Sequence, residues 1–214
     1  MSSQDLVFYY APRTRASTIL WMLEEIGAPY KLELLRLKKG DHKKPDYLAI
    51  NPMGKVPAIT HRGVAVTEAS AICAYLADAF PQADLAPPPG DPNRGPYYRW
   101  MFFAPSCMEP VITDKAFNRP PVAPSTVGYG DFDDVMDTVS AVVSNIEYIA
   151  GNHFTAADLI LAGTLNYGMM FGLIPKRDEF VAYAGRMTSR DAYKRSRARE
   201  EELAAQIEAE EKEG

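Results

Sequence analysis

The chain has 214 residues, of which 47% are hydrophobic and 24% charged, the composition of an ordinary water-soluble globular protein. Its formal net charge of -5 argues against a general attraction to nucleic acid or to anionic membranes. Two widely separated cysteines argue against a disulfide framework, and no apolar run has the length of a membrane span or the form of a signal peptide, so we expect a cytoplasmic protein.

Strand and helix patterns alternate in the first part of the chain. The predicted elements are strands over residues 6–10, 30–37, 56–60 and 64–66 and helices over residues 18–26 and 68–80, with a turn-rich connection before residue 55. Thr67 is expected to cap the second of these helices, and the last two strands flank a tight hairpin. The order predicts a small four-stranded sheet flanked by helices.

Residues 84–96 contain five prolines and two glycines and separate this region from a purely helical one. We expect an α/β domain over residues 1–82, a linker over 83–96 and an all-helical domain over 97–214 that ends in a charged tail. The helices are predicted over residues 97–117, 132–150, 155–171 and 178–188, with the tail from residue 191. Thr155 and Asp158 form a capping pair before an apolar, central helix. The tail runs from basic to acidic, against the helix dipole, so its last turns are expected to fray unless they pack on another element. One face of it is expected to be solvated, with a partner-binding role as the alternative.

Two residues of the first domain suggest a ligand site. Pro57 stands at the start of an apolar strand, where a cis bond after Val56 would turn the Val56 backbone outward to pair with an extended peptide. Glu68 opens a helix whose first N–H groups, at Ala69 and Ser70, form an anion site. Together these groups suit a peptide backbone with a free α-amino acid end, although each residue taken alone also has an ordinary structural explanation.

Three segments resemble the motifs of one protein family. NPMGKVPAI (51–59), TEASAICAYLAD (67–78) and FTAADLILAG (154–163) are similar to motifs of the cytosolic glutathione S-transferases, in the same order and on either side of a linker. The resemblance extends to about Ser196 and suggests a bacterial member with a Ser/Thr-type active-site loop. It implies a thioredoxin-like domain followed by a helical bundle, a homodimer and a role in detoxification.

The resemblance implies how glutathione would be bound. Val56, before a cis Pro57, would pair with the cysteinyl backbone, and Glu68 would bind the γ-glutamyl amino group. The helix N-terminus at Ala69 and Ser70 would bind the γ-glutamyl carboxylate. The family usually has Ser directly after the Glu, and here that position is Ala69, so binding is expected to be weaker but not lost.

The glycyl carboxylate of glutathione would be bound by basic side chains. Gly-Asp-His-Lys (40–43) resembles the stretch that plant-type members use for this end of the ligand. His42, Lys43 and Lys55 are therefore the candidates, and their positive charge is the physical reason.

Chemistry requires the glutathione thiolate, and a hydroxyl donor beside the first helix can stabilise it. Aligned on the insect-type members, FYYAPRT places Thr14 at the position of their catalytic Ser. Ser17 is the second candidate, and Tyr9 and Tyr10 rank below both. The beta-class mechanism is not expected, because the loop has no cysteine.

Positive charge offers another way to activate the thiol. Arg13 and Arg15 lie in the same loop and can lower the pKa of the thiol through their charge. In an alternative interpretation all of these are ordinary loop residues.

The second substrate is expected in an apolar cleft between the domains. Trp100, Phe103 and Met108 would line it on the first helix after the linker, with Tyr10 opposite. The alternative is that these aromatic residues belong to the core or to a subunit interface.

The sequence thus predicts an enzyme that conjugates glutathione, as cosubstrate, to a small apolar electrophile, with peroxide reduction as a related activity. The alternatives are a non-catalytic glutathione-binding or regulatory protein, or a specialised dehalogenase, isomerase or ether-cleaving enzyme. No metal is expected, because the three histidines lack metal-ligand spacing. Neither nucleic acid nor membrane is an expected partner.

Overall fold

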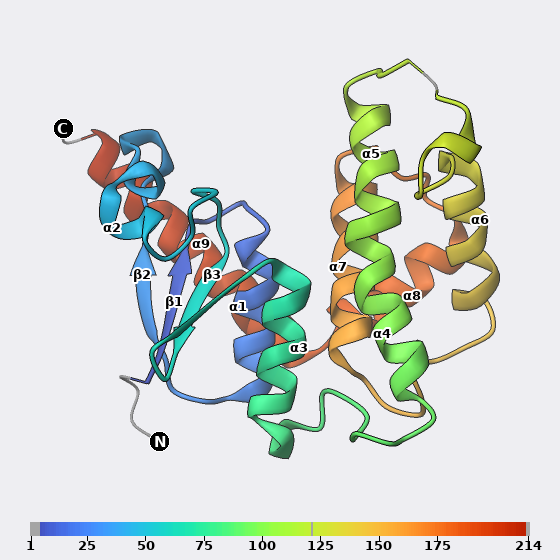
Figure 1. Cartoon of the computed structure of the whole chain (residues 1–214), viewed down its shortest axis with the longest axis horizontal. Helices are drawn as coiled ribbons and strands as arrows, with labels where there is room; N and C mark the ends of the chain where they lie inside the picture. The colour runs from blue at the N-terminus through green and yellow to red at the C-terminus, as the bar shows by residue number, and fades with distance from the viewer. Residues whose placement is uncertain (1–4, 121, 213–214) are drawn as a thin grey trace. The chain divides into compact units, whose positions relative to one another are not determined.

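The computed structural model describes residues 5–120 and 122–212, which form two compact units (Figure 1). The first unit combines the chain up to Ala83 with the C-terminal segment that begins at Asp191, and the second extends from Asp84 to Arg190. Within the described residues, no helix combines the length and the apolar character that crossing a membrane would require.

The first unit contains a sheet, three longer helices and several short turns. Its elements are β1 (Leu6–Tyr10), α1 (Ala16–Ile26), β2 (Lys31–Leu34), the 3-10 turns η1 (Leu37–Lys39) and η2 (Asp41–Lys43), α2 (Pro45–Leu48), β3 (Ala58–His61), β4 (Val64–Thr67), α3 (Ala69–Ala79), the 3-10 turn η3 (Pro81–Ala83) and α9 (Asp191–Lys212). The second unit contains α4 (Arg94–Phe103), the π-helical turn η4 (Ala104–Met108), α5 (Glu109–Ala116), the 3-10 turn η5 (Pro124–Thr126), α6 (Phe132–Val143), α7 (Ala156–Met170) and α8 (Asp178–Thr188).

The sheet has the strand order β2-β1-β3-β4, with β1 parallel to β2 and the other pairs antiparallel. In β1 the side chains of Leu6, Phe8 and Tyr10 are buried and alternate with half-buried neighbours, the period expected of a strand. Helices α1 and α3 pack against each other and against the sheet (Figure 1). The chain therefore has the predicted fold class, a thioredoxin-like β-α-β-α-β-β-α domain followed by an all-helical one.

The β3–β4 hairpin confirms the predicted tight turn. Arg62 and Gly63 occupy its two central positions with φ values of 52° and 78°, and two consecutive left-handed residues match the twist of the flanking strands. The strand predicted over residues 30–37 is shorter than expected, because the chain leaves the sheet after Leu34 and turns into η1.

The charged C-terminal tail differs from the prediction. Helix α9 belongs to the first unit, where it packs along α1, and not to the helical domain. Leu203 and Ala204 are buried on one side of it, so the tail is not solvated all round. The opposing dipole is outweighed because acidic side chains near the helix end reach basic partners in the same unit, as in the ion pair of Glu210 with Arg36.

The second unit is built around α7. The N–H and the hydroxyl of Thr155 both donate to Asp158 Oδ2, at 2.9 and 3.0 Å, which confirms the predicted capping pair. Most side chains of α7 are buried, as expected of a central helix. Helix α6 ends at Val143, short of the predicted residue 150. Pro105 lies in the π turn between α4 and α5, which interrupts the helix predicted over residues 97–117.

Candidate functional site

The segment before β3 presents a free backbone edge. The Val56–Pro57 peptide bond is cis, as the sequence predicts. The carbonyl of Lys55 accepts hydrogen bonds from the hydroxyl of Tyr47 and, at 2.8 Å, from Nδ2 of Asn51, which fixes the chain just before Val56. In the described chain no backbone group pairs with the N–H or the C=O of Val56. These two groups are therefore open to an extended ligand.

Glu68 stands at the start of α3 in an unusual conformation. Its φ of 68° is left-handed, which costs a residue with a side chain about 1–3 kcal/mol. Glu68 itself occupies the N-cap position, so the predicted cap at Thr67 is wrong, because Thr67 is the last residue of β4. The exposed carboxylate of Glu68 makes no hydrogen bond or ion pair within the described residues. A residue with a strained backbone and an unpaired carboxylate, next to a helix N-terminus, is a feature typical of binding sites.

The first two residues of α3 lie beside this carboxylate. Ala69 is half-buried and Ser70 is buried, and their backbone N–H groups precede the first intrahelical hydrogen bond, which Ile72 donates to the carbonyl of Glu68 at 2.8 Å. These two donors and the helix dipole form an anion site. The absent hydroxyl at Ala69 leaves only the backbone donors there.

Basic residues from two loops meet near Gly54. Lys43 Nζ donates to the carbonyl of Met53 at 3.1 Å. Gly54 has a φ of 59°, and a Cβ there would lie 2.6 Å from Lys43 Nζ and 2.8 Å from the carbonyl oxygen of His42, so only glycine allows this approach. The buried Nδ1 of His42 has no hydrogen-bond partner, and Lys55 is exposed without an ion pair among the described residues. The structure thus brings His42 and Lys43 to the loop that carries Lys55.

Asp41 orients the turn that carries His42 and Lys43. It accepts the backbone N–H of Arg36 at 2.9 Å and pairs with Lys44 Nζ at 2.6 Å. The Lys44 ammonium, together with the Arg36 donors, lowers the pKa of Asp41 despite the opposing effect of burial. Sequence reasoning did not single out this residue, since an Asp in a charged loop has no distinctive pattern.

The loop between β1 and α1 and the first turn of α1 carry the hydroxyl candidates. Thr14 is half-buried, and its hydroxyl donates to the carbonyl of Ala11 at 2.7 Å and accepts the N–H of Ala16 at 3.1 Å. Ser17 donates its hydroxyl to Glu200 of α9. Each hydroxyl has a single proton, so both protons are directed to acceptors within the protein.

Two other candidates of this region have structural surroundings. Tyr10 is buried, and burial together with the negative charge of Glu200 raises the pKa of its phenol, so it is a poor source of an ionised group. The ring of Tyr9 packs against Tyr47, with 5.6 Å between centroids. The guanidinium of Arg13 pairs with Glu208 at 3.0 Å, which offsets the effect of its charge on a nearby thiol.

The predicted apolar residues of the helical unit lie in and after α4. Trp100 and Met108 are buried within this unit, Phe103 is half-buried, and the rings of Trp100 and Phe103 meet edge to face at 5.1 Å. Tyr10, assigned to the opposite wall, is in the other unit.

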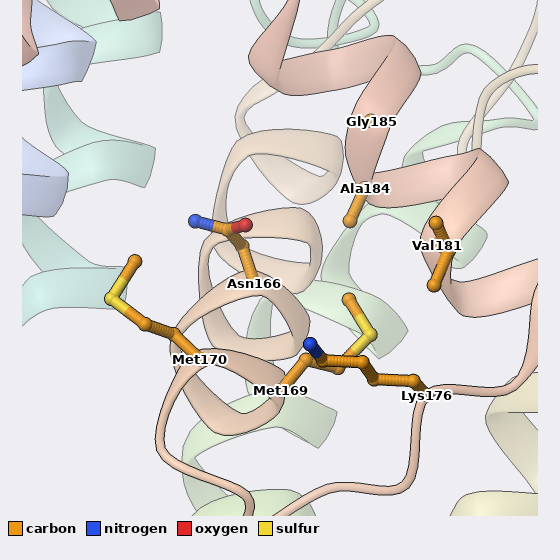
Figure 2. Close-up of a pocket in the computed structure, with 7 residues that line it drawn as sticks. All are labelled: Asn166, Met169, Met170, Lys176, Val181, Ala184 and Gly185. Carbon is orange, nitrogen blue, oxygen red and sulfur yellow. The ribbon is translucent and has the colours of Figure 1, made fainter.

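A surface pocket of about 270 Å³ lies between α7 and α8 (Figure 2). Its lining is mostly apolar, and the long side chain of Lys176 extends along one side next to Met169 (Figure 2). None of the predicted substrate-pocket residues lines it. The sequence pattern missed it because Met and Ala at helical spacing are equally typical of a core face. The lining residues are Asn166, Met169, Met170, Lys176, Val181, Ala184 and Gly185.

Metal binding and nucleophilic attack by a cysteine would each depend on suitably placed His, Cys, Asp or Glu side chains. No group of three or more His, Cys, Asp and Glu side chains in that part of the chain is placed to hold a metal ion. Cys73 is buried, and burial raises the pKa of its thiol, so it is unreactive. Cys107 is half-buried, with the hydroxyl oxygen of Ser106 3.7 Å from its sulfur.

Comparison with known proteins supports this arrangement. Residues 6–78 match the family model described as the glutathione S-transferase N-terminal domain. A relative from Hypomyces subiculosus, glutathione S-transferase hmp2, is 28% identical over 70% of this chain and 76% of its own length.

Two solved structures share the fold over most of the chain. The glutathione transferase URE2P6 of Phanerochaete chrysosporium, solved with oxidized glutathione, has a TM-score of 0.76 at 21% identity, covering 94% of this chain and 98% of its own. A sphingomonad glutathione S-transferase, solved with glutathione, has a TM-score of 0.74 at 25% identity, covering 91% and 98%. Residues 6–78 are therefore similar in sequence to the glutathione S-transferase N-terminal domain, and most of the chain shares the fold of these solved glutathione transferases.

Proposed function

We propose that this protein binds glutathione and presents its thiolate to a small apolar electrophile. One observation carries the proposal: the same unit contains both the open backbone edge at Val56 and the free carboxylate of Glu68 at a helix N-terminus. A tripeptide with an α-amino acid end supplies a partner for each group. The relatives solved with glutathione support the choice of this ligand.

The binding roles follow from charge and hydrogen bonding. Val56 pairs with the cysteinyl backbone, Glu68 with the γ-glutamyl ammonium, and the N–H groups of Ala69 and Ser70 with the γ-glutamyl carboxylate. The glycyl carboxylate binds the basic side chains at the Gly54 loop. These are His42, Lys43 and Lys55.

Thr14 is the proposed donor to the thiolate. Lowering the thiol pKa by about two units needs roughly 2.7 kcal/mol, and a hydrogen bond to a charged acceptor supplies about 1.5–3 kcal/mol. Thr14 must first release the carbonyl of Ala11, a neutral bond worth about 0.5–1.5 kcal/mol. The remaining stabilisation is therefore smaller, and the thiol pKa is expected to fall by about one unit rather than two.

We propose that the electrophile is apolar, because the residues expected to line its site are aromatic or apolar. These residues are Trp100, Phe103 and Met108. Conjugation is the first reaction to test, and peroxide reduction is the second. We also infer a cytoplasmic homodimer with a role in detoxification, as in the family.

A second candidate function is glutathione binding without transferase activity. One observation favours it, namely that the protons of both Thr14 and Ser17 are directed to internal acceptors. In that case glutathione binds but its thiol keeps the pKa of about 8.5 of a free cysteine.

Isothermal titration with glutathione, followed by the ultraviolet thiolate band of the complex against pH, tests both candidates. We expect binding with a thiol pKa lowered by about one unit, and Glu68→Gln should weaken binding about tenfold or more because it removes a charge-assisted hydrogen bond. Glu147→Gln, an exposed glutamate of the other unit, is the matched control. Binding with an unshifted pKa supports the non-catalytic function, and absence of binding by the wild type contradicts both.

A further inference from the structure

Glu200 on α9 is a buried carboxylate in an otherwise charged and exposed stretch of helix. Only 1% of its surface is exposed, although its neighbours Glu201 and Glu202 are exposed. Burying a charge is unfavourable unless hydrogen bonds and an opposite charge compensate it. The partners of Glu200 therefore indicate why it is there.

One of these partners belongs to the loop between β1 and α1, and another to the first turn of α1. The backbone N–H of Arg13 donates to Glu200 Oε1 at 2.8 Å, and the hydroxyl of Ser17 donates to the same oxygen. The guanidinium of Arg197, one turn earlier on α9, pairs with Oε2. A carboxylate from the end of the chain thus fastens a loop near its beginning.

The loop needs this fastening because its backbone is strained. Arg13 has a φ of 58°, a left-handed conformation that disfavours residues with a side chain. The Glu200 acceptor binds the N–H of this very residue. A second contact of α9, the ion pair of Glu208 with Arg13, holds the same residue from its side chain.

Glu200 also makes the hydroxyl of Ser17 different from that of Thr14, because only Ser17 donates to it. Ser17 donates to a charged acceptor, whereas Thr14 donates to the neutral carbonyl of Ala11. Hydrogen bonds to charged groups are about twice as strong as neutral ones. Thr14 can therefore exchange its acceptor for a thiolate more readily than Ser17 can.

We propose that Glu200 is a positioning residue for the thiol: it holds Arg13 and Ser17 so that Thr14 remains the hydroxyl available to glutathione. This inference rests on the proposed function. The carboxylate of Glu200 is buried and bonded to Arg13, Ser17 and Arg197, so its effect reaches the thiol through the loop.

The direction in which a Glu200 substitution changes the pKa of the glutathione thiol distinguishes a positioning role from a direct effect of the Glu200 charge. A buried carboxylate near a thiol disfavours the thiolate, so removal of its charge alone would lower the thiol pKa. Loss of the loop geometry would instead raise it. We expect Glu200→Ala to raise the thiol pKa of the glutathione complex by about one unit and to lower kcat about tenfold, with little change in KM for glutathione.

The experiment compares Glu200→Ala with two other variants by the thiolate band, by kcat and KM, and by hydrogen exchange of residues 11–17 in the free protein. Glu200→Gln, which keeps one acceptor oxygen, covers the case in which the alanine variant does not fold, and should change each quantity in the same direction but less. Glu202→Ala should behave like the wild type, because among the described residues the exposed side chain of Glu202 pairs only with Arg199.

Each result has a clear meaning. Faster exchange of the loop together with a raised thiol pKa supports the proposal. If the wild type lowers the thiol pKa and the Glu200 variants leave it unchanged or lower it further, the positioning role is overturned while the proposed function stands. A wild type that binds glutathione without lowering the thiol pKa overturns the transferase function and the role of Glu200 together.

Discussion

At the scale of single residues, the two hydroxyl groups proposed as thiol donors are distinguished by their acceptors. Thr14 and Ser17 look equivalent in sequence, and only their partners, Ala11 and Glu200, separate them. The structure also gives Thr14 a second task, because it accepts the N–H of Ala16 at the start of α1. Substitutions here act on stability as well as on chemistry.

We predict that Thr14→Val lowers kcat about tenfold or more and destabilises the free protein by about 1 kcal/mol, because it removes both a thiolate donor and an acceptor at the helix start. Thr14→Ser should retain most of both properties, since it keeps the hydroxyl.

Steady-state kinetics and thermal unfolding measure these two effects. Thr18→Val is the matched control, because the Thr18 hydroxyl makes no hydrogen bond among the described residues. Full activity in Thr14→Val would remove Thr14 from the mechanism.

At the scale of elements, short turns hold the candidate binding groups in place. The turn η2 carries His42 and Lys43, and Asp41 at its start is tied to Arg36 and Lys44. These contacts stabilise the ionised carboxylate, so the stability that Asp41 provides depends on pH.

We predict that Asp41→Asn destabilises the protein at neutral pH by about 1 kcal/mol and weakens glutathione binding. The pKa of Asp41 is lower in the folded state than its unfolded value of about 3.9. Its contribution is therefore complete above about pH 4 and disappears as the pH falls through the lower, folded-state pKa.

Urea unfolding at several pH values tests this prediction. The difference between wild type and Asp41→Asn should shrink below about pH 4. Asp46→Asn, an exposed aspartate in the next element, should show no comparable loss at neutral pH. A difference that stays constant as the pH falls would mean that Asp41 acts through packing rather than charge.

At the scale of the whole molecule, the chain returns to its first unit at the end. Helix α9 packs along α1, and Trp21 of α1 meets Tyr193 of α9 edge to face at 4.8 Å. Ion pairs of Arg195 with Glu24 and of Glu210 with Arg36 add to this contact. The first unit is thus completed by residues more than a hundred positions away.

We predict that a chain ending at Arg190 loses the cooperative unfolding of the first unit, because α1 loses its contacts with the apolar side chains of α9. Full burial of one large apolar side chain such as Leu203 stabilises the folded state by about 1.5–3 kcal/mol. Thermal unfolding followed by tryptophan fluorescence measures this, with a chain ending at Lys212 as the control. An unchanged melting temperature would show that α9 is dispensable for the fold.

Local pattern predicted much of this protein. Strand alternation in β1, the hairpin at Arg62 and Gly63, and the capping pair of Thr155 and Asp158 depend on neighbours within a few residues. Such features can be read from a sequence, because period and turn chemistry are local properties. The cis bond at Pro57 was implied instead by the resemblance to the motifs of the family, which the match of residues 6–78 supports.

Other features were decided by tertiary structure alone. The partnership of Glu200 with Ser17 joins residues 183 positions apart, and the acidic tail gave no sign that one of its glutamates is buried. The end of β2 at Leu34 and the unpaired carboxylate of Glu68 likewise depend on what packs nearby. The sequence by itself therefore determined most of the elements, their order and the residues of the candidate site. The tertiary structure decided which hydroxyl is held by a charge and which stays exchangeable, because hydrogen-bond strength depends on partners that only folding brings together.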